Sequence, residues 1–307
     1  EAGDSEPLTG GAISLSTGEG TASTSGLIVV KSVDAGTSGV SGSLQFTSGT
    51  TSGGSSGAIT VATGAATGGK GGDVLVSVGS GTAGMGGDVS VSAGASTASS
   101  GGSLLLSAGY STPSTSGSIS VRTVNAGASG VSGSLSFITG TTSNGASGSI
   151  MIQTGAATNG RGGDIVLSVG KSKTDMGGDI IFEAGDSEPL TGGAISLSTG
   201  EGTATSSGMV VLRSMDAGTL GTSGMLSFTS GTTSGGSSGS ITVATGSATG
   251  GKGGDIQVSV GAGSVGVGGS VQLASGSSTV SSGGSLSLST GYSTPTSSGG
   301  VTVRTAN

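Results

Sequence analysis

Short apolar segments recur along the whole chain, and each of them begins just after a glycine. When that glycine is counted as position 1, positions 3 and 5 are apolar in all twenty repeats, as Ile13 and Leu15 are in the first. Positions 2, 4 and 6 are mostly small or polar. Alternation of this kind, rich in β-branched residues, is typical of a half-buried strand. The anchor glycines are Gly11, Gly26, Gly42, Gly57, Gly72, Gly87, Gly102, Gly117, Gly133, Gly148, Gly163, Gly178, Gly193, Gly208, Gly224, Gly239, Gly254, Gly269, Gly284 and Gly299.

The repeat is regular on two longer scales as well. Successive anchors follow a 15-residue step, except for three 16-residue steps that start at Gly26, Gly117 and Gly208 and therefore recur once in every 91-residue block. The 22-residue segment that begins at Glu1 returns unchanged at Glu183, two such blocks further on. Copies this similar indicate recent duplication and one structural task shared by every repeat.

These observations predict an all-β fold, a parallel β-solenoid or β-helix. A single strand of about six residues cannot bury its own apolar face, so we expect the strands to stack about 4.8 Å apart. The forty side chains at positions 3 and 5 would then form one apolar core, with glycines in turns at positive φ. A 15-residue coil and a 30-residue coil both fit, and the recurrence of threonine between the segments favours the shorter one. Frequent glycine argues against helices.

The prediction for domain organisation is one continuous solenoid over residues 1–307. Neither end carries an atypical capping repeat, which a finite solenoid needs, so we expect the sequence to be a window on a longer array. Twenty coils stacked about 4.8 Å apart would form a rod of roughly 100 Å, or half that length with 30-residue coils.

Composition and charge narrow the range of functions. The net charge is −7, only 8% of residues are charged, and no basic patch exists, so we expect no nucleic-acid partner. The longest apolar run, residues 27–30, is far shorter than the roughly 20 residues that cross a bilayer, so no membrane insertion is expected. Without histidine, and with carboxylates that are mostly isolated, the chain lacks the usual acid–base groups. We expect no enzyme activity and no cofactor.

One glycine-rich motif provides the best metal candidate. Residues 68–76, GGKGGDVLV, match the nonapeptide of calcium-binding β-rolls, and residues 159–167 and 250–258 are similar. The calcium candidates are therefore Asp73, Asp164 and Asp255. However, β-rolls repeat the motif back to back, whereas here it occurs once in each 91-residue block. A glycine-rich turn before a strand is the favoured interpretation.

A column of cations recurs at the same 91-residue interval, and its first three members lie within the 16-residue repeats. Its members are Lys31, Arg122, Arg213 and Arg304, which are followed three residues later by Asp34, Asn125, Asp216 and Asn307. A lateral contact between protofilaments would explain the column. A solvated charge that limits edge association explains it too, and is the favoured interpretation.

Exposed serine and threonine offer acceptors for glycans. Thr112, Ser114 and Thr294 are candidate O-glycosylation sites, because each lies next to a proline. Regular threonine ladders would favour an ice-binding protein. Here the outward positions are mixed, as in Ser14, Gln45 and Leu75, so ice binding is a weaker alternative.

The repeats also resemble a known family. The segments 71–79, 86–94 and 101–109 read GGDVLVSVG, GGDVSVSAG and GGSLLLSAG. They resemble the strands of filamentous-haemagglutinin-type adhesins, which are right-handed β-helices. The whole chain is also similar to the Gly/Ser/Thr-rich repeats of long surface proteins of algae and other microbes. These resemblances imply an extracellular or cell-surface location.

The function we expect is that of a structural subunit of an extracellular filament, fibre or sheath. It would associate with copies of itself, end to end or laterally. The alternative is the stalk of a long cell-surface adhesin that holds a binding tip away from the cell.

Overall fold

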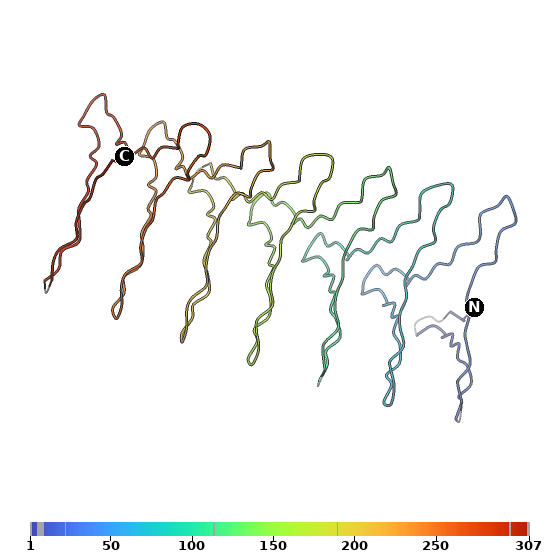
Figure 1. The fold of residues 1–307 in the computed structure, drawn as a ribbon. Helices are drawn as coiled ribbons and strands as arrows, with labels where there is room; N and C mark the ends of the chain where they lie inside the picture. The colour runs from blue at the N-terminus through green and yellow to red at the C-terminus, as the bar shows by residue number, and fades with distance from the viewer. Residues whose placement is uncertain are drawn as a thin grey trace. The chain divides into compact units, whose positions relative to one another are not determined.

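The computed structural model describes residues 2–4, 9–21, 23–112, 114–188, 190–294 and 296–305. It divides into two compact units, Glu1–Ile152 and Gln153–Asn307. Over the described residues neither unit contains a helix or a strand, only turns, bends and segments without regular structure. Figure 1 shows the chain turning back on itself repeatedly along its length.

The recurring structural element is a neck, where position 1 of one repeat lies against position 7 of the repeat before it. A Cβ added to Gly26 would lie 2.7 Å from the Cβ of Thr17, and one added to Gly72 would lie 3.2 Å from the Cβ of Thr63. All twenty anchor glycines have this neighbour nine residues earlier, or ten residues earlier after a 16-residue step. The chain therefore closes on itself once in every repeat.

Backbone hydrogen bonds close many of the necks. The N–H of the anchor glycine donates to the carbonyl oxygen of the glycine at position 8 of the preceding repeat, over 2.8–3.4 Å. Donor and acceptor are joined by a loop of seven residues, such as residues 19–25 between Gly18 and Gly26. The bonded pairs are Gly11–Gly3, Gly26–Gly18, Gly102–Gly94 and Gly117–Gly109, with Gly193–Gly185, Gly208–Gly200, Gly284–Gly276 and Gly299–Gly291 as their copies two blocks further along the chain.

Hydroxyl side chains order several of the loops. At position 10 a serine or threonine oxygen accepts a hydrogen bond from the backbone N–H of position 13, over 3.0–3.3 Å. Short polar side chains favour turns by this kind of local bond. The acceptors are Ser96, Ser172, Ser187, Thr233, Ser278 and Ser293.

The described glycines do not have the backbone conformation that we expected of turn residues. Among the described residues Gly266 alone has a positive φ, of 94°, so the prediction that glycines supply turns at positive φ is wrong. Instead they permit close approach of the backbone. A Cβ on Gly81 would lie 2.6 Å from the carbonyl oxygen of Met85 and 2.7 Å from that of Gly84, distances that no side chain tolerates.

The predicted apolar core is absent from the described residues, none of which is buried. Side chains at position 3 are 46–79% exposed and those at position 5 are 57–91% exposed. The prediction that these forty side chains face inward is therefore wrong. In almost every repeat position 3 is the less exposed of the two.

The total accessible area shows how little of its surface the single chain covers. The accessible area is 29955 Å² for a mass of 27.9 kDa. A globular monomer of this mass would expose roughly 11,000 Å², and its unfolded chain about 40,000 Å². The single chain thus covers about a quarter of its surface. Its conformation depends on local necks and loops rather than on a core.

The prediction of an all-β parallel β-solenoid is wrong, for the 15-residue and the 30-residue coil alike. A sheet requires neighbouring segments to exchange backbone hydrogen bonds in a ladder. In the described part of the chain, backbone bonds instead close single necks or turns, such as Gly130 N–H to Gly127 O at 3.3 Å. The β-helix implied by the resemblance to filamentous-haemagglutinin-type adhesins is therefore absent from these residues as well.

Two neighbouring glycines provide a test of the close-approach role. We expect Gly81→Ala to open the loop of residues 80–86, because the new Cβ collides with two backbone carbonyl oxygens. Cleavage within the loop by a broad-specificity protease, mapped by mass spectrometry, should rise several-fold. Gly79→Ala is the matched control, because its Cβ would have no atom within 4 Å. Equal cleavage of the two variants would contradict the role assigned to Gly81.

Candidate functional site: the charged necks

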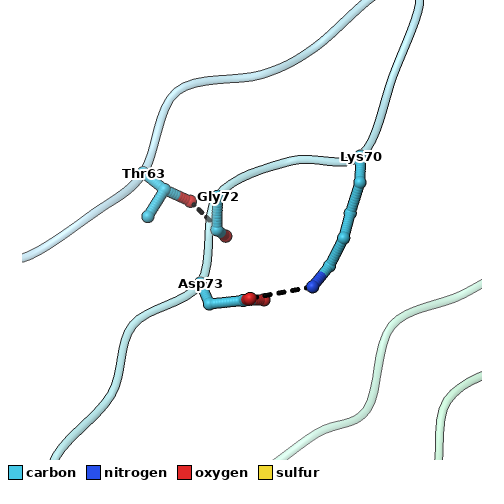
Figure 2. A network of polar contacts seen from close by, with 4 residues as sticks. All are labelled: Thr63, Lys70, Gly72 and Asp73. Carbon is cyan, nitrogen blue, oxygen red and sulfur yellow. Dashed lines mark hydrogen bonds and ion pairs between the residues drawn. The ribbon is translucent and has the colours of Figure 1, made fainter.

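Three necks carry an ion pair in addition to the glycine contact. Lys70 Nζ lies 2.8 Å from Asp73 Oδ2, and Figure 2 shows this pair beside the neck that joins Thr63 to Gly72. The equivalent pairs are Arg161–Asp164 at 2.7 Å and Lys252–Asp255 at 2.8 Å. Successive ion pairs are 91 residues apart, so each 91-residue block of the sequence contributes one of them.

The local sequence explains why these side chains meet. The two residues between cation and carboxylate are glycines, Gly71 and Gly72 in the first site, so no side chain stands between the two charged groups. The neck holds the second glycine in place, because Thr63 Oγ1 donates a hydrogen bond to the carbonyl oxygen of Gly72 over 3.1 Å. The copies of this bond are Thr154 to Gly163 at 3.3 Å and Thr245 to Gly254 at 3.2 Å.

Solvent weakens each ion pair. The Lys70 and Asp73 side chains are 78% and 76% exposed, and the other two pairs are similar. An exposed pair of this kind contributes about 0.2–1 kcal/mol and is screened by salt. The pairs therefore bias the loop ends toward the closed form, while the glycine contact provides the geometry.

The calcium candidates Asp73, Asp164 and Asp255 are the acidic partners in these three pairs. A calcium ion at Asp73 would have to compete with the ammonium group of Lys70, 2.8 Å from the carboxylate. Within the described ranges no three residues of the types His, Cys, Asp and Glu lie close enough together to hold a metal ion. The glycine-rich turn stays the favoured interpretation of these positions, and calcium binding stays the untested alternative.

The cationic column behaves differently from the charged necks. Lys31, Arg122, Arg213 and Arg304 are all exposed, and none of them takes part in the ion pairs found among the described residues. The residue after each of the first three lies in a neck: a Cβ on Gly42, Gly133 or Gly224 would lie 3.3–3.6 Å from a side-chain atom of Ser32, Thr123 or Ser214. Of the residues that follow the column, Asn307 lies outside the described residues.

The candidate glycosylation residues lie in loops. Thr112, Ser114 and Thr294 are exposed and lie in bends. Beside Thr294, the hydroxyls of Ser293 and Thr296 are 2.9 Å apart, and Ser293 is partly covered. The acceptor hydroxyls are therefore accessible, and their modification stays a prediction.

Sequence reasoning missed the cationic half of the charged necks. The signal was present, because KGGD, RGGD and KGGD recur at Lys70, Arg161 and Lys252, once in each 91-residue block. The bond from Thr63 to Gly72 could not be found from local sequence, since its partners are nine residues apart and meet only at a neck.

No family model matches the sequence, and no curated protein or solved structure matches it significantly. The resemblances to filamentous-haemagglutinin-type adhesins and to long surface proteins of algae and other microbes, both interpreted as β-solenoids, are therefore not supported by these comparisons or by the fold. A search of the described residues finds no helix both long and apolar enough to span a bilayer.

Trypsin provides a test of the ion pairs, because it must take Lys70 into its own specificity pocket. We expect Asp73→Asn to speed cleavage after Lys70 roughly two- to fivefold at low salt, and the gain to disappear at high salt. Cleavage after Lys31 serves as the internal reference. Asp88→Asn is the matched control, since Asp88 also occupies position 2 of its repeat but takes part in no ion pair among the described residues.

A peptide of residues 64–78, with and without Asp73→Asn, measures the direct effect of the substitution on trypsin. If Asp73→Asn changes the rate of cleavage after Lys70 by the same factor in the whole chain as in the peptide, the ion pair has no influence on the loop.

Proposed function

We propose that this chain is a non-catalytic structural subunit of an extracellular filament, fibre or sheath, in which copies of the chain cover one another's apolar side chains. The observation that carries the proposal is the exposure of positions 3 and 5. Forty apolar side chains recur at regular spacing and remain 46–91% exposed in the single chain. Exposed apolar surface on this scale is typical of a protein that associates with a partner.

A second copy of the chain is the partner that fits best. Its apolar side chains follow the same 15-residue and 16-residue steps, so every repeat has an equivalent on the partner. Charge opposes such contact little, because charged residues make up 8% of the chain. Burial of apolar area contributes roughly 25 cal/mol per Å², and the single chain leaves most of this contribution unused.

The free-energy cost of ordering the backbone also favours association, because the single chain has few interactions to offset it. Fixing the backbone of a residue costs about 1–2 kcal/mol. The single chain has ten neck and turn hydrogen bonds between backbone groups of the described residues, where a globular protein would have roughly one hydrogen bond per residue in total. Association with other copies would add both apolar burial and partners for backbone groups.

Glycans fit the same proposal. Thr112, Ser114 and Thr294 are exposed beside prolines, a common context for O-glycosylation, which is a modification of secreted and surface proteins. Glycans on these loops would hydrate the assembly and leave the segments of positions 1–6 free for contact between copies.

Three phenylalanines at position 5 test the proposal. Phe46, Phe137 and Phe228 follow one another at the 91-residue interval and are 67–71% exposed. We expect the triple change to serine to raise the concentration at which the chain assembles by at least about tenfold, because each phenylalanine loses its apolar burial. Light scattering and sedimentation measure that concentration.

The matched control changes three apolar loop residues with the same spacing, Met85, Met176 and Val267, to serine. These side chains are 89–98% exposed and lie outside positions 3 and 5, so assembly should be unchanged. Electron microscopy should show chains joined laterally or end to end. A chain that stays monomeric at every concentration and salt level contradicts the proposal, and single tethered chains with a distinct tip would favour the adhesin stalk instead.

A further inference from the structure

The three 16-residue repeats carry a surface that the 15-residue repeats lack. Their position 8 is Val33, Val124 or Met215, whereas every 15-residue repeat has glycine there. Val33 is 79% exposed and Met215 is 69% exposed. Each of these side chains comes two residues after a member of the cationic column. The sites therefore combine an exposed cation with an exposed apolar side chain.

Two of these sites also carry a carboxylate. Lys31 is followed by Asp34 and Arg213 by Asp216, with the same spacing as in the charged necks. Unlike the charged necks, neither of these pairs forms an ion pair within the chain. All four residues lie in the described part. Both sites thus contrast with Lys70 and Asp73, whose charged atoms lie 2.8 Å apart.

The residues between the charges also differ between the two kinds of site. The charged necks have two glycines between the charges, whereas Ser32 and Val33 stand between Lys31 and Asp34. Ser32 lies in the neck, 3.3 Å from where a Cβ of Gly42 would be, and is partly covered. Ser214 has the same place beside Gly224, at 3.4 Å.

We propose that residues 31–34 and 213–216 are docking sites for a second copy of this chain, which binds antiparallel through reciprocal ion pairs. Each site reads cation, neck residue, apolar residue, carboxylate. Two such sites related by a twofold axis place the cation of each copy beside the carboxylate of the other. Val33 or Met215 then lies between the two ion pairs and is covered by the partner.

The recurrence of the site two blocks further along the chain adds to the strength of this contact. The sites at Lys31 and Arg213 have the same order of charges, so either of them complements either site of the partner. Engagement of two linked sites strengthens binding beyond that of one site alone. The intermediate site at Arg122 has Asn125 in place of the carboxylate, and so it lacks the charge that reciprocal pairing requires.

Charge reversal tests the docking sites, and the proposal rests on the self-association proposed above. At low salt we expect Lys31→Asp with Arg213→Asp to weaken association roughly tenfold, because like charges replace the reciprocal pairs. Asp34→Lys with Asp216→Lys should weaken it similarly. An equimolar mixture of these two variants should associate as the original chain does, and so should the chain with all four changes, in which the order of charges is swapped.

The matched control is Lys70→Asp with Lys252→Asp. It changes the net charge by the same amount but removes cations that are already paired within the chain. Sedimentation at several salt concentrations measures association for every variant. If the original chain associates and the Lys31/Arg213 variant matches this control, or if the mixture fails to recover, the docking sites are wrong while the structural function stands. If the original chain does not associate at all, the proposed function itself fails.

Discussion

The close approach of two backbone segments at each neck is the constraint on which the rest of this structure depends. An anchor glycine lies against a residue nine or ten positions earlier in every repeat, and at anchors such as Gly26, Gly87 and Gly269 an added Cβ would lie 2.6–2.7 Å from that neighbour. The neck divides the chain into short loops and short apolar segments. The neck therefore fixes the repeat length, and the spacing of the charged residues follows from that length.

Cation and carboxylate occur three residues apart in two kinds of site in this chain. With two glycines between them, Lys70 and Asp73 meet within the chain. With a neck residue and an aliphatic residue between them, Lys31 and Asp34 remain apart. The same spacing thus yields either an internal pair that closes a loop or two separate charges that face solvent. Both arrangements lie within the 91-residue block, so the distribution of surface charge follows that period of the sequence.

The repeat boundaries, the 91-residue block, its doubling and the alternation at positions 3 and 5 could all be predicted from the sequence. The β-solenoid could not, and its prediction was wrong. Alternation determines which side chains share a face, but it carries no information on whether a second layer covers that face. In the described chain the alternating residues Ile28 and Val30 are 46% and 57% exposed. The ion pair at Lys70 was readable from KGGD, whereas the bond from Thr63 depends on a neck that no local pattern encodes.

The shortness of the necks has a mechanical consequence. The bond between Gly26 and Gly18 closes over eight residues, so its rupture under tension would lengthen the chain by at most about 29 Å. Because each neck involves only its own repeat and the one before it, one can yield while its neighbours stay closed. Stretching would then proceed in small, separate extensions, and a released segment could close again once the load is removed.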